Sequence, residues 1–280
     1  SGIISQMVTL PSNMFNTVTL PATLWFFNRS KPKEDEILFV DARNTFTTVD
    51  RSHRKFSDEQ IKNLAIISRL YEGKNQEFWE LIEDYIHTII CNRVKIESAI
   101  NSINKLDDER QTKIELACEK LNAKDLLISI KRFKLPSCEK TIKQFQNLCK
   151  EYNPNDNSAG KIKFFTDMSK AYEDLISQIK HIQLLDKQFM DVFLQLLAKA
   201  DIGEQDLKAL NSLNFSAVSN GIDMALNTIN ECLHYWLVNI GWLVDKFPDG
   251  KYRDITGLCK AAAIKGEDGI KDQDYSLNPG

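Results

Sequence analysis

The chain has 280 residues, of which 42% are apolar and 27% are charged, and its formal net charge is −3. This balance allows a substantial apolar core and excludes an intrinsically disordered chain. It also argues against a protein that binds nucleic acid over its whole surface, because phosphate binding needs a surplus of Lys and Arg.

Residues 1–45 carry three runs that are typical of β-strands. The runs Ile3–Leu10, Thr17–Phe27 and Ile37–Asp41 are rich in Ile, Val, Thr and Phe, and turn-forming residues separate them. The Trp25-Phe26-Phe27 stretch alternates poorly, which predicts a strand buried on both faces. Three such strands need a covering layer, so we expect this region to be the edge of a larger α/β sheet.

Residues 46–246 are predicted to form a helical domain. Ser57 and Gln60 make a capping-box start for its first helix, and Gly73 suits the C-terminal cap. The polar run 153–160 predicts a loop that would let one helical arm fold back on another.

Apolar residues recur every three or four positions along these helices, with one interruption at Asp186. Sustained spacing of this kind predicts long antiparallel helices that pack as a coiled-coil arm, so the expected fold class is mainly α. The spacing does not tell whether the seams pair within the chain or dock a partner. The seam residues are Ile82, Ile89, Ile96, Ile103, Met168, Leu175, Ile182, Phe189 and Leu196.

Residues 247–280 are rich in Gly and Pro, and they predict a turn-rich, lightly structured tail. No apolar run in the chain approaches the roughly 20 residues that span a bilayer, so no membrane contact is expected. The six cysteines form no C-x-x-C pair and do not cluster with the four histidines. They are interpreted as reduced cytosolic thiols, and no metal site is predicted.

The sequence lacks the motifs of a self-sufficient catalyst. No glycine-rich loop stands between a predicted strand and a helix start, and carboxylates lie mainly on predicted helix faces. We therefore assign no catalytic, cofactor-binding or metal-binding residue.

Two basic clusters are candidates for contact with DNA phosphate. The alternative interpretation is that their charges are ordinary helix-end charges that complement the helix dipole. The first cluster is Arg51, Arg54 and Lys55, and the second is Lys131, Arg132, Lys134, Lys140 and Lys143 around Pro136.

Six strings near the two ends of the chain, in this order, resemble the methyltransferase (M) subunits of type I restriction-modification systems. They cover residues 1–73 and 247–280, whereas the helices between match that family only in kind. The strings begin with Leu10–Phe15, Leu20–Trp25, Ile37–Arg43 and Val49–Ile61, and they continue near the end with Phe247–Lys260 and Tyr275–Gly280.

The resemblance implies the C-terminal part of an adenine-specific DNA methyltransferase subunit. The full-length subunit would depend on S-adenosylmethionine, whereas this chain lacks the family's cofactor loop and its Asn-Pro-Pro-aromatic motif and is expected to be inactive alone. The resemblance also implies a cytoplasmic complex with a specificity subunit and a restriction subunit, in which the helices dock the specificity subunit and the assembled complex binds DNA.

Two other interpretations stay open. The chain could be a free-standing coiled-coil scaffold without a methyltransferase function, or a complete small enzyme. The strands in residues 1–45 disfavour the scaffold, because a pure coiled coil has no use for buried β-strands. The absent motifs disfavour the small enzyme.

Overall fold

The computed structural model describes residues 3–15, 18–51, 53–120, 128, 135–199, 216–266 and 269–272. The chain divides into two compact units. Unit 1 comprises residues 1–85 and 239–280, and unit 2 comprises residues 86–238. The division falls within two helices, α2 (Asn75–Lys120) and α8 (Tyr235–Lys246), so each of these helices has residues in both units.

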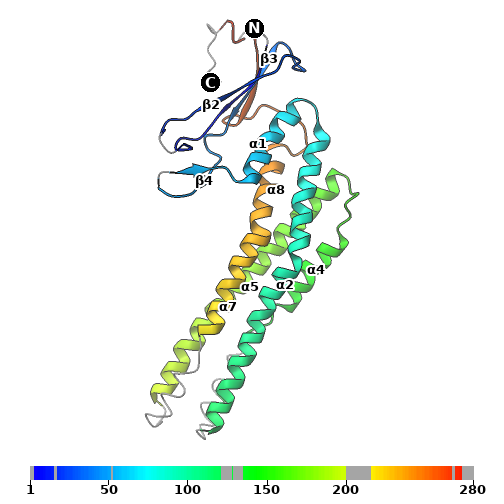
Figure 1. The fold of residues 1–280 in the computed structure, drawn as a ribbon. Helices are drawn as coiled ribbons and strands as arrows, with labels where there is room; N and C mark the ends of the chain where they lie inside the picture. Colours follow the sequence, from blue (N-terminus) through cyan, green and yellow to red (C-terminus); the bar gives the residue numbers. More distant parts are fainter. Residues whose placement is uncertain are drawn as a thin grey trace. The chain divides into compact units, whose positions relative to one another are not determined.

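Unit 1 contains a mixed four-stranded sheet with the strand order β2-β1-β3-β6 (Figure 1). Its strands are β1 (Ile4–Thr9), β2 (Thr23–Phe27), β3 (Glu36–Asp41) and β6 (Cys259–Ala263). The central pair β1 and β3 is parallel, whereas β2 and β6 each run antiparallel to the neighbouring strand. The two short strands β4 (Thr47–Thr48) and β5 (Arg54–Lys55) form a separate hairpin.

The predicted strands are present, but the segment expected to be a lightly structured tail also contributes β6. Residues 259–263 pair with residues 36–40 of β3, so the C-terminal region completes the sheet. This strand escaped prediction because Cys259-Lys260-Ala261-Ala262-Ala263 lacks the β-branched and aromatic residues that mark strands in a sequence.

Helix α1 (Asp58–Tyr71) borders the sheet through β3, and the predicted capping box starts it. The backbone N–H of Gln60 donates to Oγ of Ser57 at 3.2 Å, and the backbone N–H of Ser57 donates to Oε1 of Gln60 at 2.9 Å. Gly73 follows the helix with a φ of 81°, a left-handed conformation that suits the predicted C-terminal cap. A separate apolar cluster joins the strands to the tail through Met7, Ile37, Phe39 and Ile270.

A buried polar chain connects three helices inside unit 1. The Tyr85 hydroxyl donates to Oδ1 of Asn63 at 2.9 Å, and Nδ2 of Asn63 donates to Oδ1 of Asn239 at 3.0 Å. Buried amides that satisfy one another in this way fix the relative placement of α1, α2 and α8 within the unit.

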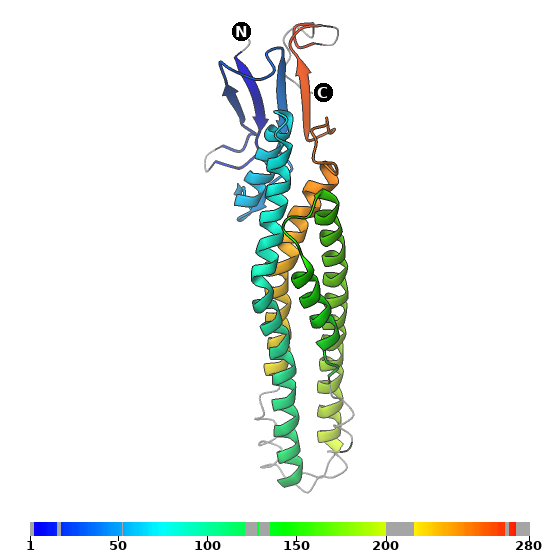
Figure 2. The same ribbon diagram turned by 90° about the vertical axis from the view of Figure 1, so that its right-hand side faces the viewer.

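Unit 2 is a bundle of helices (Figure 2). Besides its part of α2, it contains α4 (Glu139–Glu151), α5 (Ser158–Lys199) and α7 (Ser216–Ile229), followed by the π-helical turn η2 (Asn230–His234) and the start of α8. Helices α5 and α7 run in opposite directions, since Gln183 bonds to Asp223 while Tyr172 bonds to Asn230. The prediction of a mainly α chain with a small N-terminal β portion is therefore confirmed.

Candidate functional site

The outer strand of the sheet, β2, carries a row of large apolar side chains that are exposed. Trp25 and Phe26 are each 45% exposed and Phe27 is 65% exposed, so the expected burial on both faces is wrong for the chain as described. The reason is positional: β2 pairs with β1 along one edge, and no described strand pairs with its other edge. An edge strand with this composition is suited to pairing with a further strand.

The first basic cluster lies on the β4–β5 hairpin, and its members do different things. Arg51 and Lys55 are exposed. The Arg54 guanidinium stacks on the Phe46 ring at 4.0 Å and donates from Nη1 to Oγ of Ser12 at 3.0 Å. Arg54 therefore holds the hairpin against the turn after β1, whereas Arg51 and Lys55 present charge to solvent.

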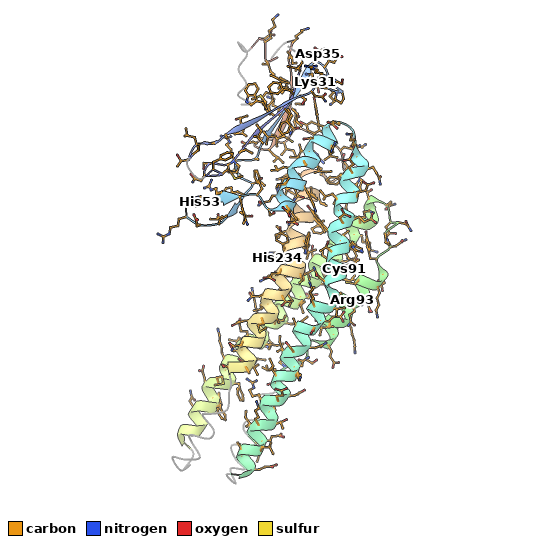
Figure 3. All side chains as sticks on the ribbon, viewed as in Figure 1. Lys31, Asp35, His53, Cys91, Arg93 and His234 are labelled. Atoms are coloured by element: carbon orange, nitrogen blue, oxygen red, sulfur yellow. The ribbon has the colours of Figure 1, made fainter. Side chains whose placement is uncertain are left out.

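His53 lies on the same hairpin beside an acidic partner (Figure 3). Its Nδ1 is 2.8 Å from Oδ2 of Asp50, and both side chains reach solvent. The pair closes the turn between β4 and β5. In the second basic cluster, Lys131, Arg132 and Lys134 lie outside the described residues, whereas Lys140 and Lys143 are exposed on α4.

The predicted apolar seams are buried within the chain. The buried members are Ile82, Ile89, Ile96 and Ile103 on α2 and Met168, Leu175, Ile182 and Phe189 on α5. The side chain of Leu196 lies outside the described part of the chain. Because these residues are buried, a protein that docks on the helices must contact other side chains.

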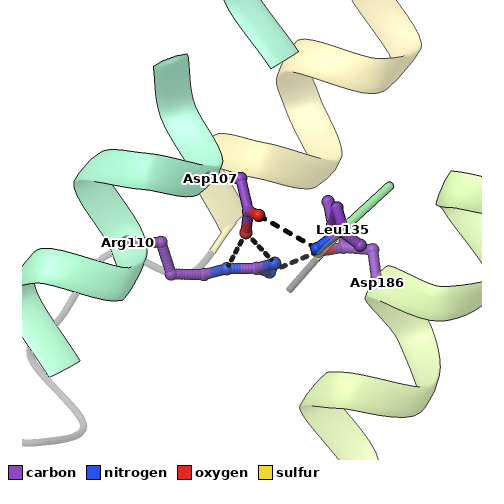
Figure 4. A network of polar contacts seen from close by, with 4 residues as sticks. All are labelled: Asp107, Arg110, Leu135 and Asp186. Carbon is purple, nitrogen blue, oxygen red and sulfur yellow. Dashed lines mark hydrogen bonds and ion pairs between the residues drawn. The ribbon is translucent and has the colours of Figure 1, made fainter. Parts of the chain in front are cut away.

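A buried ionic network lies where Asp186 interrupts the seam (Figure 4). The Arg110 guanidinium donates from Nε to Oδ1 of Asp107 at 3.1 Å and from Nη1 to Oδ1 of Asp186. The other oxygen of Asp107 accepts from the backbone N–H of Leu135 at 3.1 Å, and the guanidinium lies over the Phe189 ring at 4.2 Å. The network therefore joins α2, α5 and the segment before α4 within unit 2.

Sequence reasoning found only one member of this network. Asp186 stood out because it broke an apolar seam, whereas Asp107 and Arg110 have the appearance of ordinary surface charges. Asp107 and Arg110 are three residues apart, which places both on one helix face next to the seam. This spacing was the feature of the sequence from which their pairing could have been predicted.

A second buried charge, Lys31, lies in unit 1 (Figure 3). Its Nζ donates to the backbone oxygens of Ile4 at 3.2 Å and Glu36 at 2.9 Å. Burial lowers the pKa of this ammonium group, and the nearby Asp35 carboxylate opposes that shift. Ile4 and Glu36 are the first residues of β1 and β3, so the two hydrogen bonds of Lys31 link these neighbouring strands.

Five of the six thiols are buried, and burial raises the pKa of each, whereas Cys91 on α2 is exposed. Cys91 is labelled on α2 in Figure 3. Its Sγ lies 3.6 Å from Nδ1 of His87. No group of three His, Cys, Asp or Glu side chains occurs among the described residues in an arrangement that could hold a metal ion.

Four glycines among the described residues have a positive φ, and none of them stands between a strand and a following helix. They are Gly73, which follows α1, and Gly250, Gly257 and Gly266 in the C-terminal region. A Cβ at Gly250 would lie 2.5 Å from Nε1 of Trp79, so this glycine serves packing in unit 1.

Comparison with known proteins points to one family. Residues 1–114 match the family model described as N-6 DNA Methylase. Over 65 residues the chain is 38% identical to the Type I restriction enzyme HindI methylase subunit of Haemophilus influenzae, an alignment that covers 23% of this chain and 15% of that protein. Over 79 residues it is 29% identical to the Type I restriction enzyme MjaIX methylase subunit of Methanocaldococcus jannaschii, covering 28% of this chain and 14% of that protein.

No solved structure matches the chain. Among the described helices, none combines the length and apolar character needed to cross a membrane. The resemblance inferred from the sequence is confirmed over part of the chain: residues 1–114 match the N-6 DNA Methylase family model, and stretches of 65 and 79 residues are similar to methylase subunits of type I restriction enzymes.

Proposed function

We propose that the chain is the C-terminal portion of an adenine-specific DNA methyltransferase subunit of a type I restriction-modification system. The observation that carries the proposal is the open edge of β2, which lies inside the segment that matches the N-6 DNA Methylase family. A neighbouring strand and covering helices of a methyltransferase domain would bury Leu24, Trp25, Phe26 and Phe27. A free-standing coiled-coil scaffold gives these side chains no role.

Catalysis and cofactor binding are assigned to other parts of the full-length subunit, which would use S-adenosylmethionine in the cytoplasm. This chain would supply the closing edge of the sheet and the helical arm. Calorimetry tests this division: titration of S-adenosylmethionine into the chain alone is expected to give no binding heat. Micromolar affinity would contradict it.

The helical arm is proposed to dock the specificity subunit, and the assembled complex, which includes the restriction subunit, is proposed to bind DNA. The seam residues stabilise the arm internally, which leaves its outer faces for contact with a partner. Deletion of residues 75–240 from the full-length subunit is expected to abolish co-purification with the specificity subunit. Undiminished co-purification would refute the docking role.

Arg51 and Lys55 are proposed to contact DNA phosphate within the complex, with Arg54 holding the hairpin in place. Replacement of Arg51 and Lys55 by Gln is expected to weaken DNA binding by the complex similarly for all sequences and to reduce its salt dependence. An unchanged salt dependence, measured by fluorescence anisotropy, would remove these residues from the DNA contact.

A further inference from the structure

A small cavity lies beside Lys31 in unit 1, and its volume is about 30 Å³. The residues around it come from β1, from the connection between β2 and β3, from β3, and from α1 with the residue after it. Most of them are polar, since Pro32 and Leu38 are the only apolar residues among the described ones that line it. Apolar cavities stay dry, whereas polar cavities of sufficient size hold water.

Lys31, which is labelled in Figure 3, brings a buried charge to this cavity. The residue is only 7% exposed, and its Nζ donates to the backbone oxygens of Ile4 and Glu36. A lysine ammonium group carries three hydrogens, so these two bonds leave one hydrogen for a further acceptor. Because a buried ionised donor without an acceptor is costly, an acceptor beside this hydrogen is expected.

Oxygens that can accept from a bridging water molecule line the same cavity. The carboxylate of Glu36 uses Oε2 to accept from the Tyr71 hydroxyl at 3.0 Å, so its Oε1 is available to a further donor. The Ser68 hydroxyl donates to Oε1 of Gln6 at 2.7 Å, and its oxygen can still accept. A water molecule that accepts from Lys31 and donates to such oxygens would make the two to four hydrogen bonds typical of buried water.

The charges and the volume of the cavity favour water over other ligands. The Lys31 ammonium group repels a metal cation. An anion would meet the carboxylates of Glu36 and Glu72, and that of Glu36 already pairs with Nζ of Lys33 at 3.5 Å. About 30 Å³ holds one or two water molecules, since each needs about 10–15 Å³, and it is far too small for an organic cofactor.

We propose that this cavity is a hydration site, in which one or two ordered water molecules accept a hydrogen bond from Lys31 and bridge it to oxygens of β3 and α1. Lys31 already links β1 to β3, and the bond between Tyr71 and Glu36 links α1 to β3. The water would therefore join all three elements at one point inside the segment that matches the family model. The site does not depend on the proposed methyltransferase role.

A high-resolution crystal structure of the chain tests the proposal directly. A water oxygen is expected within about 2.7–3.2 Å of the Lys31 Nζ. Crystals soaked in sodium bromide are expected to show no anomalous signal at that position, because the neighbouring carboxylates repel an anion. An Nζ without an ordered water molecule in this range, or a bromide ion in its place, would overturn the proposal.

Oxygen-17 magnetic relaxation dispersion, which counts long-lived internal water molecules, gives a second test in solution. Lys31→Met keeps the length of the side chain but removes its donors, so the count is expected to fall by one or two. Lys33→Met is the matched control, since Lys33 also lines the cavity but has a side chain that is 45% exposed, and the count should stay at the wild-type value.

Circular dichroism establishes that both variants are folded before the counts are compared. An equal count in the wild type and in folded Lys31→Met would contradict the assignment of the water to Lys31. If Lys31→Met does not fold, because two backbone oxygens lose their donor, the crystal structure of the wild type decides alone.

Discussion

Arg110 shows how one side chain can decide the stability of unit 2. It is buried between two buried carboxylates that belong to different helices, Asp107 on α2 and Asp186 on α5. Replacement by Met would leave both carboxylates buried without their cation, which typically costs about 3–5 kcal/mol. We expect Arg110→Met to lower the urea midpoint of unfolding sharply at pH 7.

The matched control for Arg110→Met is Lys105→Met on the same helix. Lys105 is exposed and lies 4.0 Å from Glu109, so its loss is expected to cost less than about 1 kcal/mol. Replacement of Asp107, Arg110 and Asp186 together by apolar residues of similar size is expected to recover most of the stability lost in Arg110→Met. Equal midpoints for Arg110→Met and Lys105→Met would show that the network contributes nothing.

The cysteines give a second prediction at the residue scale. Burial raises the pKa of Cys149 to about 12 and that of Cys259 to about 11, above the ordinary value of 9.0. These thiols stay protonated and shielded at pH 8, whereas Cys91 is exposed. A disulfide reagent is therefore expected to react with one thiol rapidly at pH 8 in the folded chain, and Cys91→Ser should remove that fast phase. Persistence of the fast phase in the variant would contradict the assignment.

The raised thiol pKa values also link stability to pH. The folded state favours the protonated thiols, so their contribution to stability is complete below pH 9, the ordinary thiol pKa. It declines as the pH rises from about 9 toward the folded pKa values of Cys259 and Cys149, near 11 and 12. The urea midpoint is expected to fall over this range, and Cys149→Ala with Cys259→Ala should flatten that fall.

At the scale of elements, β2 is the strand whose large apolar side chains are exposed in this chain and would be buried in the proposed full-length subunit. Trp25→Glu with Phe27→Glu is expected to change the free energy of unfolding of this chain by less than about 1 kcal/mol, because both side chains are exposed. The same change should reduce self-association, since charged edge strands pair poorly. Urea denaturation and light scattering measure the two effects.

Phe39→Ala serves as the control for the β2 variant, because Phe39 is buried in β3, which is separated from β2 by β1, and its loss is expected to cost about 3–5 kcal/mol. In the full-length subunit, the β2 variant is expected to be as damaging as Phe39→Ala, since the proposed methyltransferase domain covers β2 there. A β2 variant that destabilises the isolated chain as strongly as Phe39→Ala would show that the strand is already covered.

The helices and strands differ in how far their burial could be predicted from the sequence. The heptad spacing of Ile89, Ile96 and Ile103 indicated buried helix faces because burial selects apolar residues at the helical period. The exposure of Trp25 does not follow from the sequence. An apolar composition indicates that a side chain is suited to burial, but it does not indicate which segment covers that side chain. Arg110 was missed because a charge paired across helices cannot be distinguished by local pattern from a charge in solvent.

The π-helical turn at Asn230–His234 could not be predicted from the spacing of the apolar residues in the sequence either. Glu231 within the turn and Tyr235 just after it are both exposed and lie four residues apart, an interval that an ordinary α-helix also allows. The tertiary contact that accompanies the turn, the stack of His234 on Tyr172, joins residues far apart in the sequence. The periodicity of nearby residues does not indicate such contacts between distant parts of the sequence.

At the scale of the whole molecule, the chain combines a segment similar to DNA methylase subunits with a helical unit that has its own packed core. The aligned segments cover 15% and 14% of the two curated relatives, so the activity of a complete subunit is a proposal for this chain. We propose that another part of the full-length subunit transfers the methyl group, that the strands of this chain close the sheet of that subunit, and that its helices bind the partner.

The proposed role of this chain can be measured as methyl transfer from labelled S-adenosylmethionine to DNA by the full-length subunit that contains it, assembled with its specificity subunit. We expect label at the exocyclic amino group of adenine in the wild-type complex, and loss of that label when Trp25 and Phe27 are both replaced by Glu. A wild-type complex that places no label on adenine, or a β2 variant that labels it at the wild-type rate, would refute this role.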